Sequence, residues 1–189
     1  MTEREWVKSV TPKLEESMRA FNDKLRATDS FKLPYSSEIL NYSDDEPDQQ
    51  NLIKYETDIL IYEKLEEDRW KPRIIIEAKI NSITTHDAIT YSQKAQTHKN
   101  VHPYLHYGIL IGNRKHYPLP GRLFRHGEHF DFMLSWKEYN AQNEEWNALI
   151  EILKSEFEAS VALDEIIFNS RSKNRKRFTC LHRPLILSK

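Results

Sequence analysis

A run of three isoleucines leads directly into an acid and a lysine at residues 74–79, Ile74-Ile75-Ile76-Glu77-Ala78-Lys79. Nowhere else in the 189 residues does a lysine follow an acidic residue two positions later. The isoleucines predict a buried central strand, and alternation along it puts Ile75, Glu77 and Lys79 on one face, with Ala78 on the other. Because charged groups at the end of a buried strand are costly to desolvate, this pairing favours a functional role.

A second strand-like stretch precedes the first and carries another acid. Residues 55–62 read YETDILIY, with Asp58 directly before an apolar run. A charged turn at residues 66–68 separates a strand predicted over 54–65 from one predicted over 73–80, which favours a hairpin. Pairing of these strands would bring Asp58 beside Glu77 and Lys79, in a cluster that a divalent cation would neutralise. The competing interpretation is a cross-strand salt bridge between ordinary exposed strands.

The rest of the chain alternates between helical and strand-like patterns. Apolar residues recur at steps of three and four from Glu3 to about Ala27, which predicts an amphipathic helix that either begins at Thr11-Pro12 or kinks there. Further predicted elements are a strand at 35–42, a loop at 44–51, a helix at 86–99, strands at 101–111 and 130–134, and a helix at 144–168. This order predicts an α/β fold in a single domain spanning residues 1–189.

Composition limits the class of protein. Hydrophobic residues make up 39% and charged residues 30%, as in soluble globular proteins, and the apolar runs are too short to cross a bilayer. The charged N-terminus lacks the pattern of a secretory signal, so a cytoplasmic location is expected. The single cysteine, Cys180, excludes an internal disulfide and a thiolate zinc site.

The order of elements and the residues of the two strands resemble the PD-(D/E)xK nuclease superfamily. The resemblance spans roughly Glu3 to Ile111: a helix, a hairpin that carries Asp58 and Glu77-Ala78-Lys79, a crossover helix and another strand. Thr57 precedes Asp58 where the family motif has proline. The resemblance implies a restriction-endonuclease-like core of order α-β-β-β-α-β, a mixed sheet flanked by helices, here followed by a C-terminal helix.

That resemblance implies a metal-dependent phosphodiesterase, since the superfamily includes restriction endonucleases, Holliday-junction resolvases and DNA-repair nucleases. The compact chain carries no helicase or ATP-binding motif, which favours a type II restriction endonuclease that cuts duplex DNA without a nucleotide cofactor. A homodimer is expected because two sites related by a twofold axis match the antiparallel strands of a duplex. A Holliday-junction or repair nuclease of the same fold is the next candidate. A catalytically silent nucleic-acid-binding module is the alternative from a different class.

The strand residues would supply the metal ligands. Magnesium prefers hard oxygen ligands, so Asp58, Glu77 and the carbonyl of Ala78 are expected to hold Mg²⁺, with Mn²⁺ as the alternative ion. Lys79 is expected to orient the attacking water and to neutralise the phosphate. Burial and metal charge would lower the pKa of Lys79 while two carboxylates would raise it, so the direction stays open at this point.

The helices supply further candidates through the same resemblance. An acid from the first helix would complete the metal site, and Glu15 flanks the apolar stripe whereas Glu16 projects away from it. Glu38 in the predicted first strand competes with Glu15. In the crossover helix, Gln93 is a candidate for contact with the attacking water and Lys94 for contact with the substrate phosphate. Solvated helix surface is the competing explanation for these residues.

Basic residues in the C-terminal half are candidate DNA contacts, although the net charge of the chain is −1. They occur in a turn-rich segment at 112–127, which suits a recognition insert, and in a basic run near the C-terminus. The residues concerned are Arg114, Lys115, Arg122 and Arg125 in the segment, and Arg171, Lys173, Arg175, Lys176 and Arg177 in the run. A structural loop and a solvated tail are the competing explanations.

Histidines recur in the same half of the chain. His98, His102 and His106 are four residues apart, but Pro103 interrupts the helical register that would align them on a zinc ion. Phosphate or base contacts are therefore the preferred interpretation for four of the histidines, His98, His102, His126 and His129.

Overall fold

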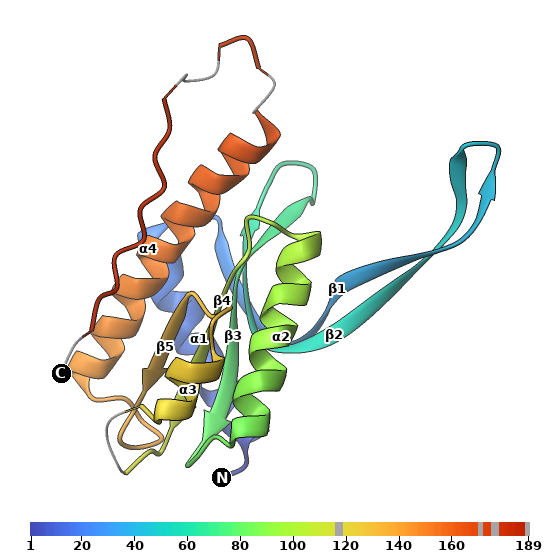
Figure 1. The fold of residues 1–189 in the computed structure, drawn as a ribbon. Coiled ribbons are helices and arrows are strands. Elements are labelled where there is room, and N and C mark those ends of the chain that lie inside the picture. Colours follow the sequence, from blue (N-terminus) through green and yellow to red (C-terminus); the bar gives the residue numbers. More distant parts are fainter. Residues whose placement is uncertain (116–118, 170–171, 175–177, 188–189) are drawn as a thin grey trace.

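The computed structural model describes residues 1–115, 119–169, 172–174 and 178–187. Within these ranges the chain forms a five-stranded mixed sheet in the order β1-β2-β3-β4-β5, with helices on both faces (Figure 1). The elements along the chain are α1 (Glu3–Phe21), β1 (Leu25–Ser43), β2 (Glu46–Lys64), β3 (Trp70–Ile80), α2 (Thr85–Val101), β4 (His106–Gly112), α3 (Gly121–His126), β5 (Phe132–Ser135) and α4 (Asn143–Phe168). The predicted α/β class, with a mixed sheet flanked by helices, is confirmed.

Strand β3 forms the centre of the sheet, as its isoleucines predict. Strands β1, β2 and β3 pair antiparallel in sequence order, whereas β3, β4 and β5 pair in parallel. Ile74, Ile75 and Ile76 are fully buried, and the predicted hairpin between β2 and β3 is present. Because parallel strands need a crossover connection, α2 returns the chain from β3 to β4, and α3 lies between β4 and β5.

Helix α1 differs from its sequence pattern at both ends. Thr2 caps the helix in a capping box, so the helix does not begin at Thr11, and it continues through Pro12. The predicted extension to Ala27 is wrong because the chain has already entered β1 at Leu25. Leu25 therefore continues the apolar stripe as a buried strand residue, which the helical spacing alone does not distinguish.

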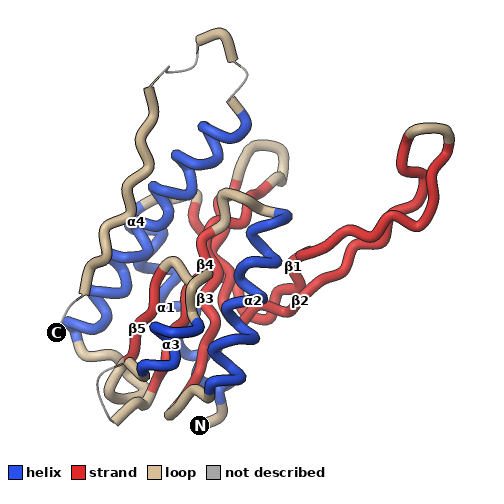
Figure 2. The backbone as a smooth tube through the Cα atoms, in the orientation of Figure 1, coloured by secondary structure: helices blue, strands red, loops and turns tan. Residues whose placement is uncertain are grey.

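Strands β1 and β2 are each 19 residues long and form a hairpin that extends far beyond the rest of the sheet (Figures 1 and 2). The predicted loop at 44–51 is wrong, since the chain turns at Asp44 and Asp45 and enters β2 at Glu46, which pairs with Ser43. We call residues 34–55 of this hairpin the arm. Its strands carry polar residues on both faces, so they lack the alternation that identifies a half-buried strand.

Hydrophobic clusters on the two faces fix the helices to the sheet. One cluster packs Leu14 of α1 and Leu153 of α4 against Ile76, and the other packs Ala95 of α2 against Ile75. Neighbouring isoleucines of β3 thus point to opposite faces, as the strand period requires. The α2 face is the one on which Glu77 and Lys79 lie.

Elements after β3 fall close to their predicted positions. Helices α2 and α4 cover the predicted helices, while β4 and β5 begin later than predicted, and the turn-rich segment 112–127 contains the short helix α3. None of the helices in the described part of the chain combines the length and the apolar character needed to cross a membrane.

Candidate functional site

Asp58 lies where β2 separates from β3. Pairing between these strands reaches Ile59 and Ile76, and the arm then carries the preceding part of β2 away from the sheet (Figure 1). Asp58 Oδ2 accepts a hydrogen bond from the backbone N–H of Ala78 at 2.8 Å. The neighbouring Thr57 is buried, and its hydroxyl donates to the backbone of β1 at 3.0 Å. The fork between the strands therefore holds a carboxylate in a fixed position.

Glu77 is 3% exposed and lies on the α2 face of β3. Its carboxylate accepts hydrogen bonds from the Tyr107 hydroxyl at 2.7 Å and from Lys94 Nζ at 3.1 Å. Burial, and then the charge of Asp58, raise the pKa of Glu77 from its ordinary 4.5 to about 7, although Lys94 and Tyr107 act in the opposite direction. Near neutral pH a large share of Glu77 therefore keeps its proton unless further positive charge arrives, which is what a bound cation would supply.

Lys79 extends from the same face of β3. Its Nζ lies 3.1 Å from Glu3 Oε1 and 4.7 Å from the centroid of the Tyr91 ring. Burial lowers the pKa of Lys79, but hydrogen bonds with Tyr91 and Glu3 outweigh burial, so the net shift of this pKa is upward. Among the groups of the chain itself, the balance therefore favours a protonated lysine, which offers a positive charge and hydrogen-bond donors to the site.

Helix α2 presents Tyr91 and Lys94 to these residues because positions three apart share a helix face. Lys94 Nζ donates to the Glu56 carbonyl at 2.9 Å as well as to Glu77. Gln93, which the resemblance assigns to the attacking water, is exposed. The structure therefore brings Lys94, and not Gln93, to the carboxylates. We call the following four residues the carboxylate site: Asp58, Glu77, Lys79 and Lys94.

The acid of the first helix that contacts the site is Glu3, not Glu15. Glu15 Oε2 accepts a hydrogen bond from the backbone N–H of Ala27 at 3.2 Å. Glu15 also lies about 18 Å along the helix axis from Glu3, at a rise of about 1.5 Å per residue. The competing candidate Glu38 lies in the arm, where Asn51 donates to it at 3.4 Å. The prediction of Glu15 as a metal ligand is therefore corrected.

Three residues that contact the carboxylate site are not among those predicted from the sequence: Glu3, Tyr91 and Tyr107. The sequence does contain a pattern that indicates Tyr91, because this residue lies three positions before Lys94 on the predicted crossover helix and so shares its face. Tyr107 reaches Glu77 because β4 pairs with β3 in parallel with Tyr107 opposite Ile75, a register that the sequence does not reveal. Glu3 depends on how α1 packs across the sheet, which no local pattern encodes.

The donor atoms at the fork suit a hard divalent cation. Asp58 and Glu77 provide carboxylate oxygens on the same face of the sheet. In an extended strand the N–H and C=O of one residue point to the same side, so the carbonyl of Ala78 faces the side from which Asp58 accepts its hydrogen bond. Mg²⁺ and Mn²⁺ prefer oxygen donors of this kind. The residues present therefore fit Mg²⁺, and the raised pKa of Glu77 indicates carboxylates that lack full compensation.

The other predicted DNA contacts are dispersed over the fold. Arg122 donates a hydrogen bond to the backbone carbonyl of Ile83 at 3.0 Å and so stabilises the loop that follows β3. Arg114 is half-buried, whereas Lys115, Arg125 and Lys173 are exposed. The remaining predicted contacts, Arg171, Arg175, Lys176 and Arg177, lie outside the described residues.

A second charged group connects β4, α4 and the C-terminal segment. The ligand atoms of His106, Asp131 and Glu156 all lie within 4.8 Å of one another. Asp131 pairs with Lys99 at 2.7 Å and with Arg183 at 2.6 Å, and His106 Nδ1 contacts Glu156. Because two cations already compensate Asp131, we interpret this group as an ion-pair network that braces the fold.

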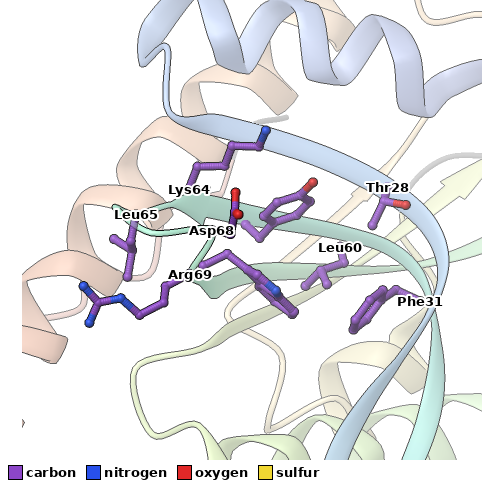
Figure 3. Close-up of a pocket in the computed structure, with 9 residues that line it drawn as sticks. Thr28, Phe31, Leu60, Lys64, Leu65, Asp68 and Arg69 are labelled. Carbon is purple, nitrogen blue, oxygen red and sulfur yellow. The ribbon is translucent and has the colours of Figure 1, made fainter.

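A cavity of about 370 Å³ lies against β1 and β2, where Phe31 and Leu60 form part of its lining (Figure 3). Leu60 at its border is the next residue after Asp58 on that face of β2, about 7 Å further along the strand. The residues that line it are Thr28, Phe31, Leu60, Tyr62, Lys64, Leu65, Asp68, Arg69 and Trp70. The catalytic candidates are not among them, so we place the chemistry at the fork and not in this cavity.

Comparison with known proteins gives no match for this chain, either to a protein-family model or to a curated protein. Its function must therefore be inferred from the carboxylate site.

Proposed function

We propose that the protein is a Mg²⁺-dependent endodeoxyribonuclease of the PD-(D/E)xK superfamily, with a restriction-endonuclease-like core. The observation that carries the proposal is the meeting of Asp58, Glu77 and Lys79 where β2 separates from β3. The order α1-β1-β2-β3-α2-β4 agrees with the core of that superfamily. A surface salt bridge does not account for an acid that is 3% exposed and whose pKa is raised by burial and then by the charge of a second acid.

In this proposal Asp58, Glu77 and the Ala78 carbonyl hold the metal. Mg²⁺ bound there supplies an activated water near neutral pH and neutralises charge on the phosphate oxygens. The protein's own groups fix the ligands beforehand. Ala78 N–H holds Asp58, and the Tyr107 hydroxyl with Lys94 holds Glu77.

The two lysines hold the substrate and the attacking water. Glu3 and Tyr91 keep the Lys79 ammonium protonated and in place, so it donates to the water and to a phosphate oxygen without accepting a proton. Lys94 adds a second positive charge from the α2 side of the same site. Preorganised donors of this kind contribute about 10²- to 10³-fold each to the rate when they face developing negative charge.

Within this class we infer a type II restriction endonuclease that acts on duplex DNA as a homodimer. Two copies of the fork related by a twofold axis would face the two antiparallel strands. The second candidate is a Holliday-junction or repair nuclease, which the stacked rings of Tyr35 and Tyr55 at the base of the arm favour. Sedimentation of the protein with and without duplex DNA tests the homodimer.

The test of the proposed function is cleavage of long plasmid and phage DNA with Mg²⁺ or with chelator. Discrete fragments are expected from the wild type in Mg²⁺, and chelator, Asp58→Ala and Lys79→Ala should each abolish them. Asp48→Asn, which changes an exposed acid of the arm, is the matched control and should cleave normally. A smear of products would favour the repair or junction nuclease. If the folded protein cleaves neither duplex, branched nor single-stranded DNA, the proposal is wrong and a silent binding module is favoured.

A further inference from the structure

Two tyrosines stack face to face at the base of the arm. The rings of Tyr35 and Tyr55 have centroids 3.8 Å apart and planes inclined by 5°. The ring of His98 on α2 lies 6.0 Å from each of them. Tyr55 nevertheless remains 40% exposed. The stack is thus anchored to α2 on one side and open to solvent on another.

A bulge in β1 produces this arrangement. The pairing between β1 and β2 shifts between Pro34 and Ser36, so Tyr35 is an extra residue without a direct partner on β2. Bulges redirect a side chain and are frequent beside active sites. Here the bulge coincides with the residue that stacks on Tyr55, at the point where the arm leaves the body of the protein (Figure 1).

The stack is joined to the carboxylate site by a lysine. Lys94 Nζ lies 5.7 Å from the centroid of the Tyr55 ring and 3.1 Å from Glu77 Oε2. One ammonium therefore reaches both the aromatic surface and the acid proposed to hold the metal. An aromatic face beside a cation is the combination by which proteins hold single-stranded nucleic acid, since the ring stacks on a base and the cation attracts the phosphates.

We propose that Tyr55, backed by Tyr35, is a stacking site for an unpaired nucleobase of the strand whose phosphate enters the carboxylate site. The proposal rests on the proposed nuclease function and favours its second candidate, the junction or repair nuclease, over the restriction endonuclease. The substrate would then be DNA with unpaired bases near the cut, such as a single strand, a flap or a junction. Stacking tolerates any base because each has a π face, so the site gives preference for strand structure and not for sequence.

The same surface could instead bind a DNA duplex that lies along the hairpin. The charge of the arm argues against this alternative. The outer part of the arm carries a group of acids that would repel a phosphate backbone. They are Glu38, Asp44, Asp45, Glu46 and Asp48. The strand is therefore expected to meet the protein at the base of the arm, near Lys94, and not along its length.

The test measures binding in chelator, where no cleavage occurs, with a single-stranded oligonucleotide that carries one 2-aminopurine. Stacking on Tyr55 should change the emission of the 2-aminopurine. Tyr55→Leu should weaken binding at least about fivefold, as expected for loss of one base–aromatic stack, whereas Tyr55→Phe should bind like the wild type. Tyr42→Leu, at an exposed tyrosine further out on the arm, is the matched control and should change nothing. Affinity for a fully paired duplex of the same sequence should be equal in wild type and Tyr55→Leu.

Three results would overturn the stacking site. One is a folded Tyr55→Leu protein, checked by circular dichroism, that binds the single strand as tightly as the wild type. Another is an equal loss of affinity in Tyr42→Leu or for the fully paired duplex. The third is a wild type that does not bind the oligonucleotide. Each is separable from failure of the nuclease proposal, which is read from Mg²⁺-dependent cleavage by the wild type and its loss in Asp58→Ala.

Discussion

Asp58 Oδ2 and the backbone nitrogen of Ala78 lie 2.8 Å apart across the fork between β2 and β3. The strands behind the fork are paired and buried, with Ile59 1% and Ile76 0% exposed. The hydrogen bond therefore holds the Asp58 charge at the end of a buried ladder, where it raises the pKa of Glu77. Two carboxylates held close together repel each other when both are charged, and a cation bound between them compensates this repulsion.

Burial has the largest effect on the protonation of Glu77, and the charge of Asp58 is expected to add to it. Asp58→Asn keeps an oxygen that can accept from Ala78 but removes the negative charge, so the pKa of Glu77 should fall below about 7. Carbon-detected NMR of the glutamate carboxyl groups, recorded in chelator between pH 4 and 9, measures this change. A pKa of Glu77 that stays the same or rises in Asp58→Asn would contradict the electrostatic account.

Glu77 is expected to make the folded protein less stable as the pH rises. Its pKa of about 7 in the folded state exceeds the ordinary 4.5, so the folded state binds more protons between these values and stability falls as the pH rises through them. The full difference corresponds to about 3 kcal/mol. As the pH is raised from 4.5 to 8, the free energy of unfolding of Glu77→Gln should therefore increase by up to about 3 kcal/mol relative to that of the wild type.

Urea unfolding in chelator at both pH values measures this gain. Taking the difference between wild type and variant cancels other titrations, including that of His98, whose pKa burial lowers to about 4. Glu38→Gln in the exposed arm is the control and should follow the wild type. Parallel pH dependence in wild type and Glu77→Gln would show that Glu77 does not hold its proton as described.

Lys79 is expected to act through its charge. Lys79→Met removes the ammonium and should lower the single-turnover cleavage rate by at least about 10²-fold, the loss typical of one preorganised donor. Lys79→Arg keeps a cation that cannot serve as a base, and should retain clearly more activity than Lys79→Met. Equally low residual activity in both variants, with a pH profile that lacks the acid limb of the wild type, would instead identify Lys79 as a base.

Lys94 is expected to set the amount of Mg²⁺ that the site requires. It lowers the pKa of Glu77, so Lys94→Met should raise that pKa and leave more of Glu77 protonated at pH 7. Since a carboxylate must lose its proton to bind metal, half-maximal cleavage should need several-fold more Mg²⁺ at pH 7, and the difference should shrink at pH 9. The neighbouring and exposed Gln93 supplies the control, because Gln93→Ala should leave the Mg²⁺ requirement unchanged.

Glu3 and Glu15 of α1 are expected to have different roles, Glu3 in cleavage and Glu15 in stability. Glu15→Gln weakens the hydrogen bond to Ala27 and should cost about 1 kcal/mol or less of unfolding free energy while cleavage stays normal. Glu3→Gln removes the carboxylate charge that holds Lys79 Nζ at 3.1 Å, so it should slow cleavage with little effect on stability. Thermal unfolding and cleavage rates on both variants check this, and the reverse pattern would restore Glu15 as the functional acid.

The sheet core was predictable because its signals are local. The run Ile74-Ile75-Ile76 identified the central strand, and the charged turn after β2 identified the hairpin that brings Asp58 to Glu77. The arm was not predictable in the same way. Its residues gain nothing from burial on one face, so their pattern is that of a polar loop, and the long pairing is visible only in three dimensions.

The residues in and around the site also differ in whether a local sequence pattern predicts them. Alternation within one strand placed Glu77 and Lys79 together, and the periodicity of α2 would have placed Tyr91 beside Lys94. Glu3 and Tyr107 come from elements whose positions depend on tertiary packing and on strand register, so no spacing in the sequence connects them to the site.

The most direct test of the proposed nuclease is the rate of phosphodiester cleavage in DNA as Mg²⁺ is titrated from zero, for the wild type and for Asp58→Ala. A set of supercoiled plasmid, single-stranded and branched substrates covers the proposed classes. We predict cleavage of at least one substrate that rises with Mg²⁺ in the wild type and is lost in the variant. Equal cleavage by the two proteins, or no cleavage of any substrate by folded wild type, would contradict a metal-dependent nuclease at Asp58 and Glu77.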